Sequence, residues 1–361
     1  MGNGLLPAVQ SLGRWLRLML VGALAAGLVI GCQGSSPEVT TAPPATPVSL
    51  VGTGASFPLI FYTKLFSEYN RLHPTVQINY QDTGSAAGIQ QMVAATVDFA
   101  GSDVAMTDEE IAQATQGIVL VPMTAGSVAM AYNLPDLEGE LRLSREALVG
   151  IFAGEITNWS DGAIAATNPE ATLPDLPILV VHRSDGSGST AAFTAHLSAL
   201  SPQWEASVGS GLNVNWPVGV GIKSTAGISA QIMQEAGAIG YVEYSYAKRL
   251  GMATAALENQ GGNFIQPSPD SVRAALSEAA VPDDLRIFVP DPSTPAAYPI
   301  VTYSWLLLYE TYDDPAKAAA LKDMVQWGLT EGQSFSEELG YTPLSPAVVE
   351  GAIAALDRVQ S

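Results

Sequence analysis

Apolar residues along the chain alternate between strand-like and helix-like spacing. Residues 178–181 form a short apolar run typical of a buried strand, and residues 59–71 place apolar side chains at the intervals of one helix face. Residues 76–80 alternate apolar and polar positions, as a half-exposed strand does. Strands that alternate with helices in this way are typical of α/β proteins with mainly parallel sheets.

The same patterns predict elements along the rest of the chain. A capping box at residues 107–110 (TDEE) begins one helix. Residues 257–296 are rich in proline and acidic residues, so we expect surface there, interrupted by one helix. Further strands are expected at residues 48–51, 118–121, 127–132, 238–242 and 300–309, and helices at residues 144–153, 191–197, 269–279, 315–328 and from 346 onward.

Two of these strands are placed to connect two lobes. Strand 127–132 ends at an Asn-Leu-Pro turn and predicts a crossing out of the first lobe, and strand 300–309 predicts the return. We therefore expect lobe 1 to comprise residues 48–133 and 300–361, and lobe 2 to comprise residues 134–299. A chain of 361 residues, 47% of them hydrophobic, is long enough to bury a core in each lobe.

The first 31 residues have the composition of a bacterial secretion signal. Arg14 and Arg17 supply positive charge, and residues 16–30 are almost wholly apolar but fall short of the roughly 20 residues of a membrane-spanning helix. Residues 29–32 (VIGC) read as a lipobox, the cleavage site of bacterial lipoproteins. We predict that residues 1–31 are removed as a signal peptide; an uncleaved anchor is the alternative.

Cys32 would then become the first residue of the mature chain and carry the lipid. Several acyl chains on Cys32 would hold the protein at a membrane, whereas one chain alone binds weakly. Residues 32–47 are rich in proline, threonine and serine without periodicity, which predicts a flexible tether between lipid and globule.

Composition excludes several functions. The chain carries 15 lysines and arginines against 35 aspartates and glutamates, a net charge of −20, which argues against nucleic acid and anionic membrane surfaces as partners. A small anion held in a closed cleft is not excluded, because local geometry outweighs a screened global field. The single cysteine rules out an intramolecular disulfide and a cysteine-based metal site. We expect no metal and no cofactor, because the three histidines are scattered and the sequence has no phosphate-binding lysine loop.

A short stretch after strand 178–181 has the chemistry of an anion site. Residues 182–190 (HRSDGSGST) combine an arginine, close-packing glycines, serine hydroxyls and the start of a helix, whose free N–H groups attract anions. Residues 52–58 (GTGASFP) and 80–88 (YQDTGSAAG) repeat the strand-turn-helix arrangement. An ordinary capped junction explains any one of them, but three together indicate anion binding. His182 is interpreted as structural rather than as a base.

Residues 97–103 (VDFAGSD) place Asp103 in a turn at the end of a strand. Its carboxylate could belong to the same anion site or simply form an Asx turn or a helix N-cap, and the residues alone leave both readings open.

These motifs, in this order, resemble the phosphate-binding protein of bacterial phosphate ABC transporters. The resemblance covers residues 50–350 and includes GTGASFP (52–58), YQDTGSAAG (80–88), VDFAGSD (97–103), IFAGEITNWSD (151–161), VVHRSDGSGS (180–189) and GAIGYVEYSYA (237–247). It implies a type II periplasmic-binding-protein fold, in which two α/β lobes joined by a two-crossing hinge enclose the ligand in a cleft.

The resemblance also implies a set of ligand contacts. Phosphate would be held by hydroxyls, backbone N–H groups and one guanidinium, while Asp103 would accept a proton of the ligand and Asp185 would orient the arginine. The implied phosphate ligands are Ser56, the Phe57 N–H, Ser85, Asp103, Arg183, Ser187, the Gly188 N–H and Ser189. Residues 223–227 (KSTAG) depart from the family's Gly/Asn-rich turn, so no ligand role is assigned to them.

Together these expectations describe a receptor with no catalytic residue. It would bind inorganic phosphate with high affinity and deliver it to the permease of an ABC transporter. It would be a monomer, anchored through Cys32 in the periplasm or at the cell surface. A receptor of the same fold for another oxyanion such as sulfate, a phosphohydrolase that uses a clustered serine, and a surface sensor or adhesion protein remain as alternatives.

Overall fold

The computed structural model describes residues 47–361 apart from residue 278. The strands are β1 Val48–Gly54, β2 Val76–Asp82, β3 Phe99–Ser102, β4 Ile118–Tyr132, β5 Arg142–Leu143, β6 Leu179–Arg183, β7 Val220–Ile222, β8 Ala238–Glu243, β9 Ala253–Thr254, β10 Ala256–Glu258, β11 Phe264–Ile265 and β12 Val301–Tyr309. The helices are α1 Leu59–Leu72, α2 Ser85–Val93, α3 Asp108–Gln113, α4 Arg145–Ala153, α5 Gly162–Ala165, α6 Gly188–Leu200, α7 Pro202–Ser207, α8 Thr225–Gln234, α9 Tyr244–Leu250, α10 Pro269–Leu276, α11 Pro315–Leu329, α12 Ser336–Leu339 and α13 Pro346–Leu356, with a 3₁₀ helix at Glu331–Phe335.

Most strands in the described residues belong to one sheet, in the order β2-β1-β3-β12-β4-β8-β6-β7, with β9 added beside β4. Its outer parts are parallel, because β1 pairs in parallel with β2 and β3, and β6 with β7 and β8. Its middle is antiparallel, because β12 runs against β3 and β4, and β4 against β8. The prediction of mainly parallel sheets therefore holds only for the outer parts, since the strands that cross the middle return in the opposite direction.

The middle strand β4 is continuous, so the prediction of two separate strands at residues 118–121 and 127–132 was wrong. Proline removes a ladder donor, so Pro122 would ordinarily interrupt a central strand. The structure accommodates Pro122 at a register shift, where Trp305 pairs with Pro122 and Ser304 with Thr124. All 15 residues of β4 are buried. Packing on both faces therefore stabilises the strand despite its proline.

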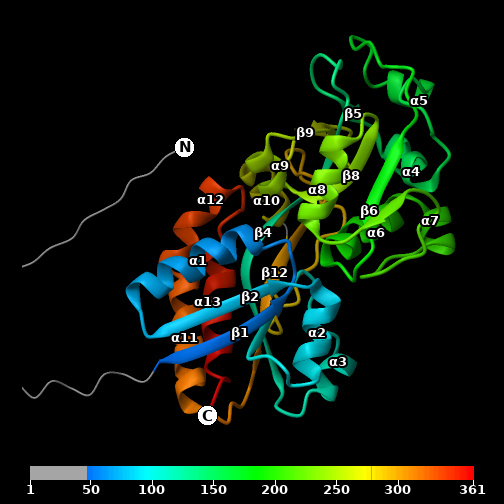
Figure 1. The fold of residues 1–361 in the computed structure, drawn as a ribbon. Coiled ribbons are helices and arrows are strands. Elements are labelled where there is room, and N and C mark those ends of the chain that lie inside the picture. Colours follow the sequence, from blue (N-terminus) through cyan, green and yellow to red (C-terminus); the bar gives the residue numbers. More distant parts are fainter. Residues whose placement is uncertain (1–46, 278) are drawn as a thin grey trace, which may run out of the picture. The chain divides into compact units, whose positions relative to one another are not determined.

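β4 belongs to both halves of the sheet. Residues 118–127 of β4 pair with β12, whereas residues 128–132 pair with β8. In Figure 1, β1, β2, α1, α11 and α13 lie beside one half of this strand, and β6, β8, α4 and α6 lie beside the other. The chain thus forms two α/β groups that share the middle strands of one sheet.

Residues 257–296 are less superficial than their composition suggested. β10 and β11 pair with each other, and β10 pairs with β5 to complete a small sheet. Asn259, Leu285 and Ile287 are buried. The predicted helix is present as α10, capped by Ser268, whose hydroxyl accepts a hydrogen bond from Ser271 N–H. Asn259 explains the ordering, because its side chain donates to three carbonyls between residues 294 and 297.

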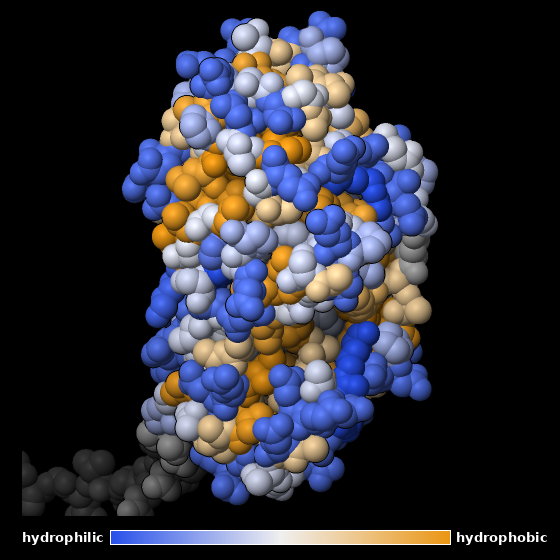
Figure 2. Space-filling model, turned by 90° about the vertical axis from the view of Figure 1, so that its right-hand side faces the viewer, coloured by the Kyte–Doolittle hydropathy of each residue, from blue (hydrophilic) through white to orange (hydrophobic). Residues whose placement is uncertain are grey.

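The signal peptide, Cys32 and the tether up to residue 46 lie outside the described residues. β1 begins at Val48, where the tether was expected to end. Over residues 47–361, residue 278 aside, no helix has the length and apolar character needed to cross a membrane. Figure 2 shows hydrophilic residues over much of one face, with apolar residues visible between them.

Candidate anion-binding site

The carboxyl ends of the parallel strands carry the polar residues that meet between the two halves of the sheet. Ser56, Ser85 and Asp103 follow the ends of β1, β2 and β3, and Arg183 is the last residue of β6. Ligands bind at the carboxyl ends of strands in open α/β sheets, because the loops and helix starts gather there. The structure therefore brings the predicted residues from four distant stretches to one place.

Arg183 is the central cation of this site and is only 5% exposed. Its Nε donates to Asp185 Oδ1 at 2.7 Å and its Nη2 donates to Asp185 Oδ2. This two-point ion pair fixes the plane of the guanidinium, as predicted for Asp185. The ion pair lowers the pKa of the Asp185 carboxyl, although burial alone would raise it. Nη1 remains on the side that faces Ser56.

Ser56 lies on the opposite half of the sheet from Arg183 and contacts it directly. Arg183 Nη1 donates to Ser56 Oγ at 3.0 Å and to Thr225 Oγ1 at 3.3 Å. The hydroxyls of Ser56 and Thr225 are 2.9 Å apart. All three side chains are at least nine-tenths buried. A guanidinium and two hydroxyls thus form one hydrogen-bonded cluster.

Thr225 has a place in the site that its motif did not predict. It is the first residue of α8, after β7 and the N-cap Ser224, and so repeats the strand-turn-helix arrangement of the other three stretches. The sequence pattern that would predict this strand is weak, because β7 has only three residues and only Ile222 among them is partly buried. Ser224 has a positive φ of 60°, and its N–H donates to Asp185 Oδ1 at 3.2 Å. The turn is therefore tied to the arginine's partner.

Ser85 begins α2 and lies opposite the start of α6. Its Oγ accepts hydrogen bonds from the N–H groups of Asp103 and Gly188, both at 3.2 Å. A hydroxyl oxygen accepts two hydrogen bonds, so these N–H donors occupy its lone pairs and leave its proton to donate. The distance from Ser85 Oγ to Asp103 Oδ2 is 3.4 Å, so the hydrogen bond that this proton can make to Asp103 is weak. Ser85 is thus organised as a donor toward an acceptor in the cleft.

Asp103 is a buried carboxyl group, 3% exposed. Ser304 on β12 donates to its Oδ1 at 2.8 Å, and Thr302 donates to its backbone carbonyl at 3.0 Å. Burial raises the pKa of Asp103 to about 7, while Ser304, the charge of Arg183 and Ser85 act in the opposite direction. Thr107 is the N-cap of α3, so Asp103 is not the N-cap of that helix. The two β12 hydroxyls are contacts that sequence reasoning missed, since nothing local links residues about 200 positions apart.

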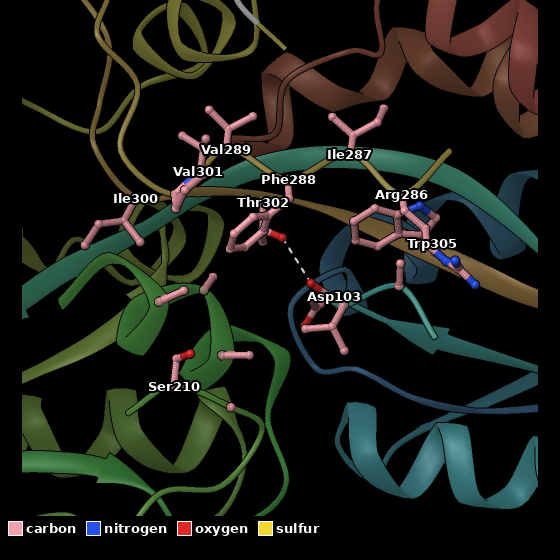
Figure 3. Close-up of a pocket in the computed structure, with 17 residues that line it drawn as sticks. Asp103, Ser210, Arg286, Ile287, Phe288, Val289, Ile300, Val301, Thr302 and Trp305 are labelled. Atoms are coloured by element: carbon pink, nitrogen blue, oxygen red, sulfur yellow. Dashed lines mark hydrogen bonds between the residues drawn. The ribbon is translucent and has the colours of Figure 1, made fainter. Parts of the chain in front are cut away.

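Asp103 also lies at one end of a cavity of about 300 Å³ (Figure 3). The walls are mainly apolar and come from the first turns of α6, from β12 and from the segment 286–290. In Figure 3, Trp305 lies close to Arg286 at one end of this lining, and Ile300 lies at the other end. An apolar wall beside a carboxyl group favours its uncharged form, which agrees with the raised pKa of Asp103.

The start of α6 supplies the remaining predicted residues. Ser187 is the N-cap, and its hydroxyl accepts from Thr190 N–H at 3.2 Å, so in this arrangement it serves the helix. The Ser189 hydroxyl is buried and has no hydrogen-bond partner within the described part of the chain. A buried unpaired hydroxyl at a helix start is a donor suited to an anion. Across the cleft, Tyr341 O–H donates to the Phe57 carbonyl at 2.6 Å and so holds that peptide group.

Two glycines permit the close approach of the loops. Gly84 has φ of 94°, and a Cβ built there would lie 2.7 Å from the Gly186 carbonyl oxygen. A Cβ on Gly188 would lie 2.5 Å from Asp103 Cβ. The Ala86 N–H also donates to Gly186 O at 3.1 Å, which joins the two halves directly. The halves therefore contact each other at the site, and side chains larger than hydrogen would separate them.

His182 is structural, as expected. Its ring stacks on Trp216 with centroids 4.9 Å apart, and partial burial lowers its pKa. Across residues 47–361 without residue 278, no three His, Cys, Asp or Glu side chains gather as metal ligands would. The site as built offers donors and one cation to an anion, and of its two aspartates Asp185 is paired with Arg183 while Asp103 is not.

Comparison with known proteins agrees with this architecture. The model of the PBP superfamily domain matches residues 40–331. The solved phosphate-binding protein of Stenotrophomonas maltophilia superposes with a TM-score of 0.68 at 21% identity, covering 86% of this chain and 94% of that one. A phosphate-bound, high-affinity periplasmic phosphate-binding protein gives 0.69 at 20% identity, covering 85% and 93%. The fold is thus the type II periplasmic-binding-protein fold, and the class is that of a substrate-binding receptor.

Sequence comparison narrows this class. The chain is 39% identical to the phosphate-binding protein PstS of Pasteurella multocida, over 84% of this chain and 88% of that protein. It is 34% identical to PstS of Methanocaldococcus jannaschii, over 92% of both chains. The chain belongs to the PstS family of phosphate-binding proteins. The predicted family and fold are confirmed.

Proposed function

We propose that this protein binds inorganic phosphate and delivers it to the permease of an ABC transporter. The observation that carries the proposal is that Arg183 and Asp103 are both buried, and that they lie close enough for the charge of Arg183 to lower the pKa of Asp103. Arg183 supplies positive charge and a planar donor, while Asp103 supplies an acceptor for a ligand that brings its own proton. Phosphate near neutral pH is an anion that still carries a proton. The family of PstS proteins supports the same assignment.

The ligand contacts proposed are those expected from the sequence, except for Ser187, whose hydroxyl accepts a hydrogen bond from Thr190 N–H at the start of α6. Ser56, Ser85 and Ser189 would donate hydroxyl protons. The N–H groups of Phe57 and Gly188 would donate from the starts of α1 and α6, and Ser187 would support the turn before α6. Support comes from the unpaired Ser189 hydroxyl and from the Asp103 N–H, which still occupies one acceptor position of Ser85 when the Gly188 N–H turns to the ligand. For Gly188, binding would exchange its present hydrogen bond to Ser85 for one to the ligand.

Sulfate is the nearest competing ligand and Asp103 argues against it. A sulfate dianion has no proton, so its oxygen would face the carboxylate of Asp103 without a hydrogen bond. An unpaired buried charge of that kind costs several kcal/mol, so the affinity for sulfate should be much lower than the affinity for phosphate while Asp103 is ionised. The phosphohydrolase alternative has little support, because Ser56 is bonded to Arg183 and Thr225, and the one carboxyl group beside Ser85, that of Asp103, is 3.4 Å from its hydroxyl.

Calorimetry of the full-length protein against phosphate and sulfate tests the assignment. Tight binding of phosphate is expected at about pH 8, where Asp103, with a pKa of about 7, is mostly ionised, and sulfate should bind more weakly than phosphate there. Equal affinity for both anions would contradict the proposal and favour a general oxyanion receptor. Release of phosphate from a phosphoester in the same preparation would favour the hydrolase instead.

Closure of two lobes would convert binding into a signal for the permease. The proposed lobes are residues 48–133 with 300–361, and residues 134–299, supported by the change of partner along β4 after Ser127. Ser56 belongs to the first of these lobes and Arg183 to the second. A phosphate ion that contacts both residues therefore binds most tightly when the lobes are closed. The permease would then distinguish the closed form from the open one.

The protein is also proposed to act as a monomer held at the membrane through lipid on Cys32. The lipobox sequence and the tether length of residues 32–47 support this anchor. Cys32→Ser should release the protein from membrane fractions while its phosphate affinity stays the same. Continued sedimentation of the Cys32→Ser protein with membranes would favour an uncleaved anchor at residues 1–31.

A further inference from the structure

Thr225 begins α8 and contacts a residue from the other half of the sheet. It is 2% exposed, and its Oγ1 lies 2.9 Å from Ser56 Oγ, although the two residues are 169 positions apart in sequence. Ser56 follows β1 and Thr225 follows β7, and these strands lie near opposite ends of the sheet. The two hydroxyls are therefore in contact only because the two halves of the sheet meet at the site.

The position of the Thr225 side chain is fixed by its neighbours. The N–H of Ser224 donates to Asp185 Oδ1 at 3.2 Å, and the Ser229 hydroxyl donates to the Thr225 carbonyl at 2.8 Å. The branched Cβ of threonine also restricts rotation of its side chain. These contacts hold the Thr225 hydroxyl in its place beside Ser56.

Arg183 donates to both hydroxyls. Its Nη1 is 3.0 Å from Ser56 Oγ and 3.3 Å from Thr225 Oγ1. A hydroxyl has one proton and two acceptor positions, so each hydroxyl keeps its proton and one acceptor position after this contact. The hydrogen bond between Ser56 and Thr225 uses one of these two protons. Its direction decides which hydroxyl can still donate to a ligand.

The surroundings of Thr225 favour one direction. In the part of the chain that the structure describes, Ser56 Oγ is the acceptor in reach of the Thr225 hydroxyl proton. Neither carboxyl oxygen of Glu243, the buried last residue of β8, has a hydrogen-bond partner among the described residues, so Glu243 does not take this proton. Thr225 therefore donates to Ser56 when an anion accepts the Ser56 proton. Both acceptor positions of Ser56 are then filled, and its own proton is left for the anion.

We propose that Thr225 is a positioning residue for phosphate binding: its hydroxyl donates to Ser56 Oγ across the cleft and directs the Ser56 proton toward the bound anion. Without this donor, Ser56 keeps a free lone pair, which repels a phosphate oxygen when it faces the cleft. Arg183 can turn an Nη1 proton from Ser56 to the ligand, whereas Thr225 keeps Ser56 as its acceptor. This role rests on the proposed phosphate binding, with Ser56 as one of the contacts.

The test compares phosphate dissociation constants of full-length variants by calorimetry. Thr225→Val removes the hydroxyl and keeps the branched shape, whereas Thr225→Ser keeps the hydroxyl. We expect Kd to rise about threefold to tenfold in Thr225→Val, the value of about one hydrogen bond, and to stay near the wild-type value in Thr225→Ser. Thr225→Ala, a second variant without the hydroxyl, should weaken binding likewise and serves if valine does not fit the site.

Thr194→Val is the matched control. Thr194 is as buried as Thr225, and its hydroxyl donates to the Thr190 carbonyl at 2.8 Å and accepts from the Gly211 N–H at 3.2 Å. None of these groups is a proposed ligand contact, so this variant should leave Kd unaltered. Melting temperatures in phosphate-free buffer check that every variant folds.

A double-mutant cycle separates a role through Ser56 from a role through Arg183. If Thr225 acts by orienting the Ser56 hydroxyl, Thr225→Val should cause no further rise of Kd once Ser56→Ala has removed that hydroxyl. If Thr225 acts instead by holding Arg183, the rise should be the same with and without the Ser56 hydroxyl.

Three results would overturn the role of Thr225. One is a Kd of Thr225→Val equal to that of Thr194→Val. Another is an undiminished effect of Thr225→Val in the Ser56→Ala background. The third is a Thr225→Ser protein that binds as weakly as Thr225→Val, because the hydroxyl would then not be the responsible group. A wild-type protein that binds no phosphate would instead overturn the proposed function itself.

Discussion

The hydroxyl of Ser304 donates a 2.8 Å hydrogen bond to the Asp103 carboxyl group and joins β12 to the end of β3. This bond lowers the pKa of Asp103 against the effect of burial. A hydrogen bond to a charged group contributes about 1.5–3 kcal/mol, so Ser304→Ala should raise that pKa by about one to two pH units. Carbon NMR titration of the carboxyl carbon measures the shift. Ser127→Ala, which removes another buried serine hydroxyl, is the control, and equal pKa values in all three proteins would contradict the prediction.

Discrimination against sulfate should depend on pH through Asp103. Burial raises the pKa of Asp103 to about 7, so below neutral pH the carboxyl group holds a proton and can donate it to a sulfate oxygen. Sulfate should therefore begin to compete with phosphate as pH falls below about 7, and Asp103→Asn should admit sulfate at every pH. Competition calorimetry across this range measures the effect. If wild type excludes sulfate equally at pH about 5 and about 8, the proton on Asp103 does not set specificity.

Asp103 should also make the free energy of unfolding decrease as pH rises in phosphate-free buffer. Its folded pKa of about 7 lies above the value of 3.8 for a free aspartate, so the folded state keeps its proton where the unfolded state has lost it. The contribution of Asp103 to folding stability is then greatest below about pH 4. It decreases by roughly 4 kcal/mol between about pH 4 and about pH 7, and it does not change further above about pH 7. Urea unfolding at several pH values measures this slope. Asp103→Asn should lack that contribution, and an identical slope in the variant would refute it.

Arg183 should be required for affinity, and lysine should not replace it. Loss of the guanidinium removes the cation from a buried anion site, at a cost of about 2–5 kcal/mol in binding, or about 30-fold to several thousandfold. Arg183→Lys keeps the charge but cannot donate to both oxygens of Asp185 and to Ser56 at once. Calorimetry gives Kd, and circular dichroism checks the fold, since Arg183 is buried. Wild-type affinity in Arg183→Lys would show that the fork geometry is dispensable.

Gly188→Ala should weaken binding without unfolding the protein. The new methyl group would lie 2.5 Å from Asp103 Cβ and 2.8 Å from Ser85 Oγ, both on the opposite side of the cleft. Because Gly188 starts α6, alanine suits the helix, and the clash is relieved when the halves separate. We expect at least about tenfold weaker phosphate binding with a similar melting temperature in phosphate-free buffer. Gly162→Ala, at the start of α5, where a Cβ meets nothing within 4 Å, is the control for glycine replacement. Unchanged affinity would show that the halves do not close this tightly.

Much of the architecture was determined by the sequence alone. Helical spacing at residues 59–71 and the capping box at residues 107–110 reappear as α1 and the start of α3, because local periodicity and capping are short-range properties. The pairing of Asp185 with Arg183 was equally local, since the two residues are two positions apart in sequence. These features depend on neighbours along the chain, which sequence patterns contain.

Only the tertiary structure decided which distant residues share the site. Ser304 and Thr302 contact Asp103 because β12 returns antiparallel to β3, and Thr225 contacts Ser56 because two halves of the sheet meet. No local pattern records such pairings. β4 likewise runs straight through Pro122 because packing on both faces outweighs the lost ladder bond. The sequence determined which residues could bind an anion, and the return of β12 determined which of them face it together.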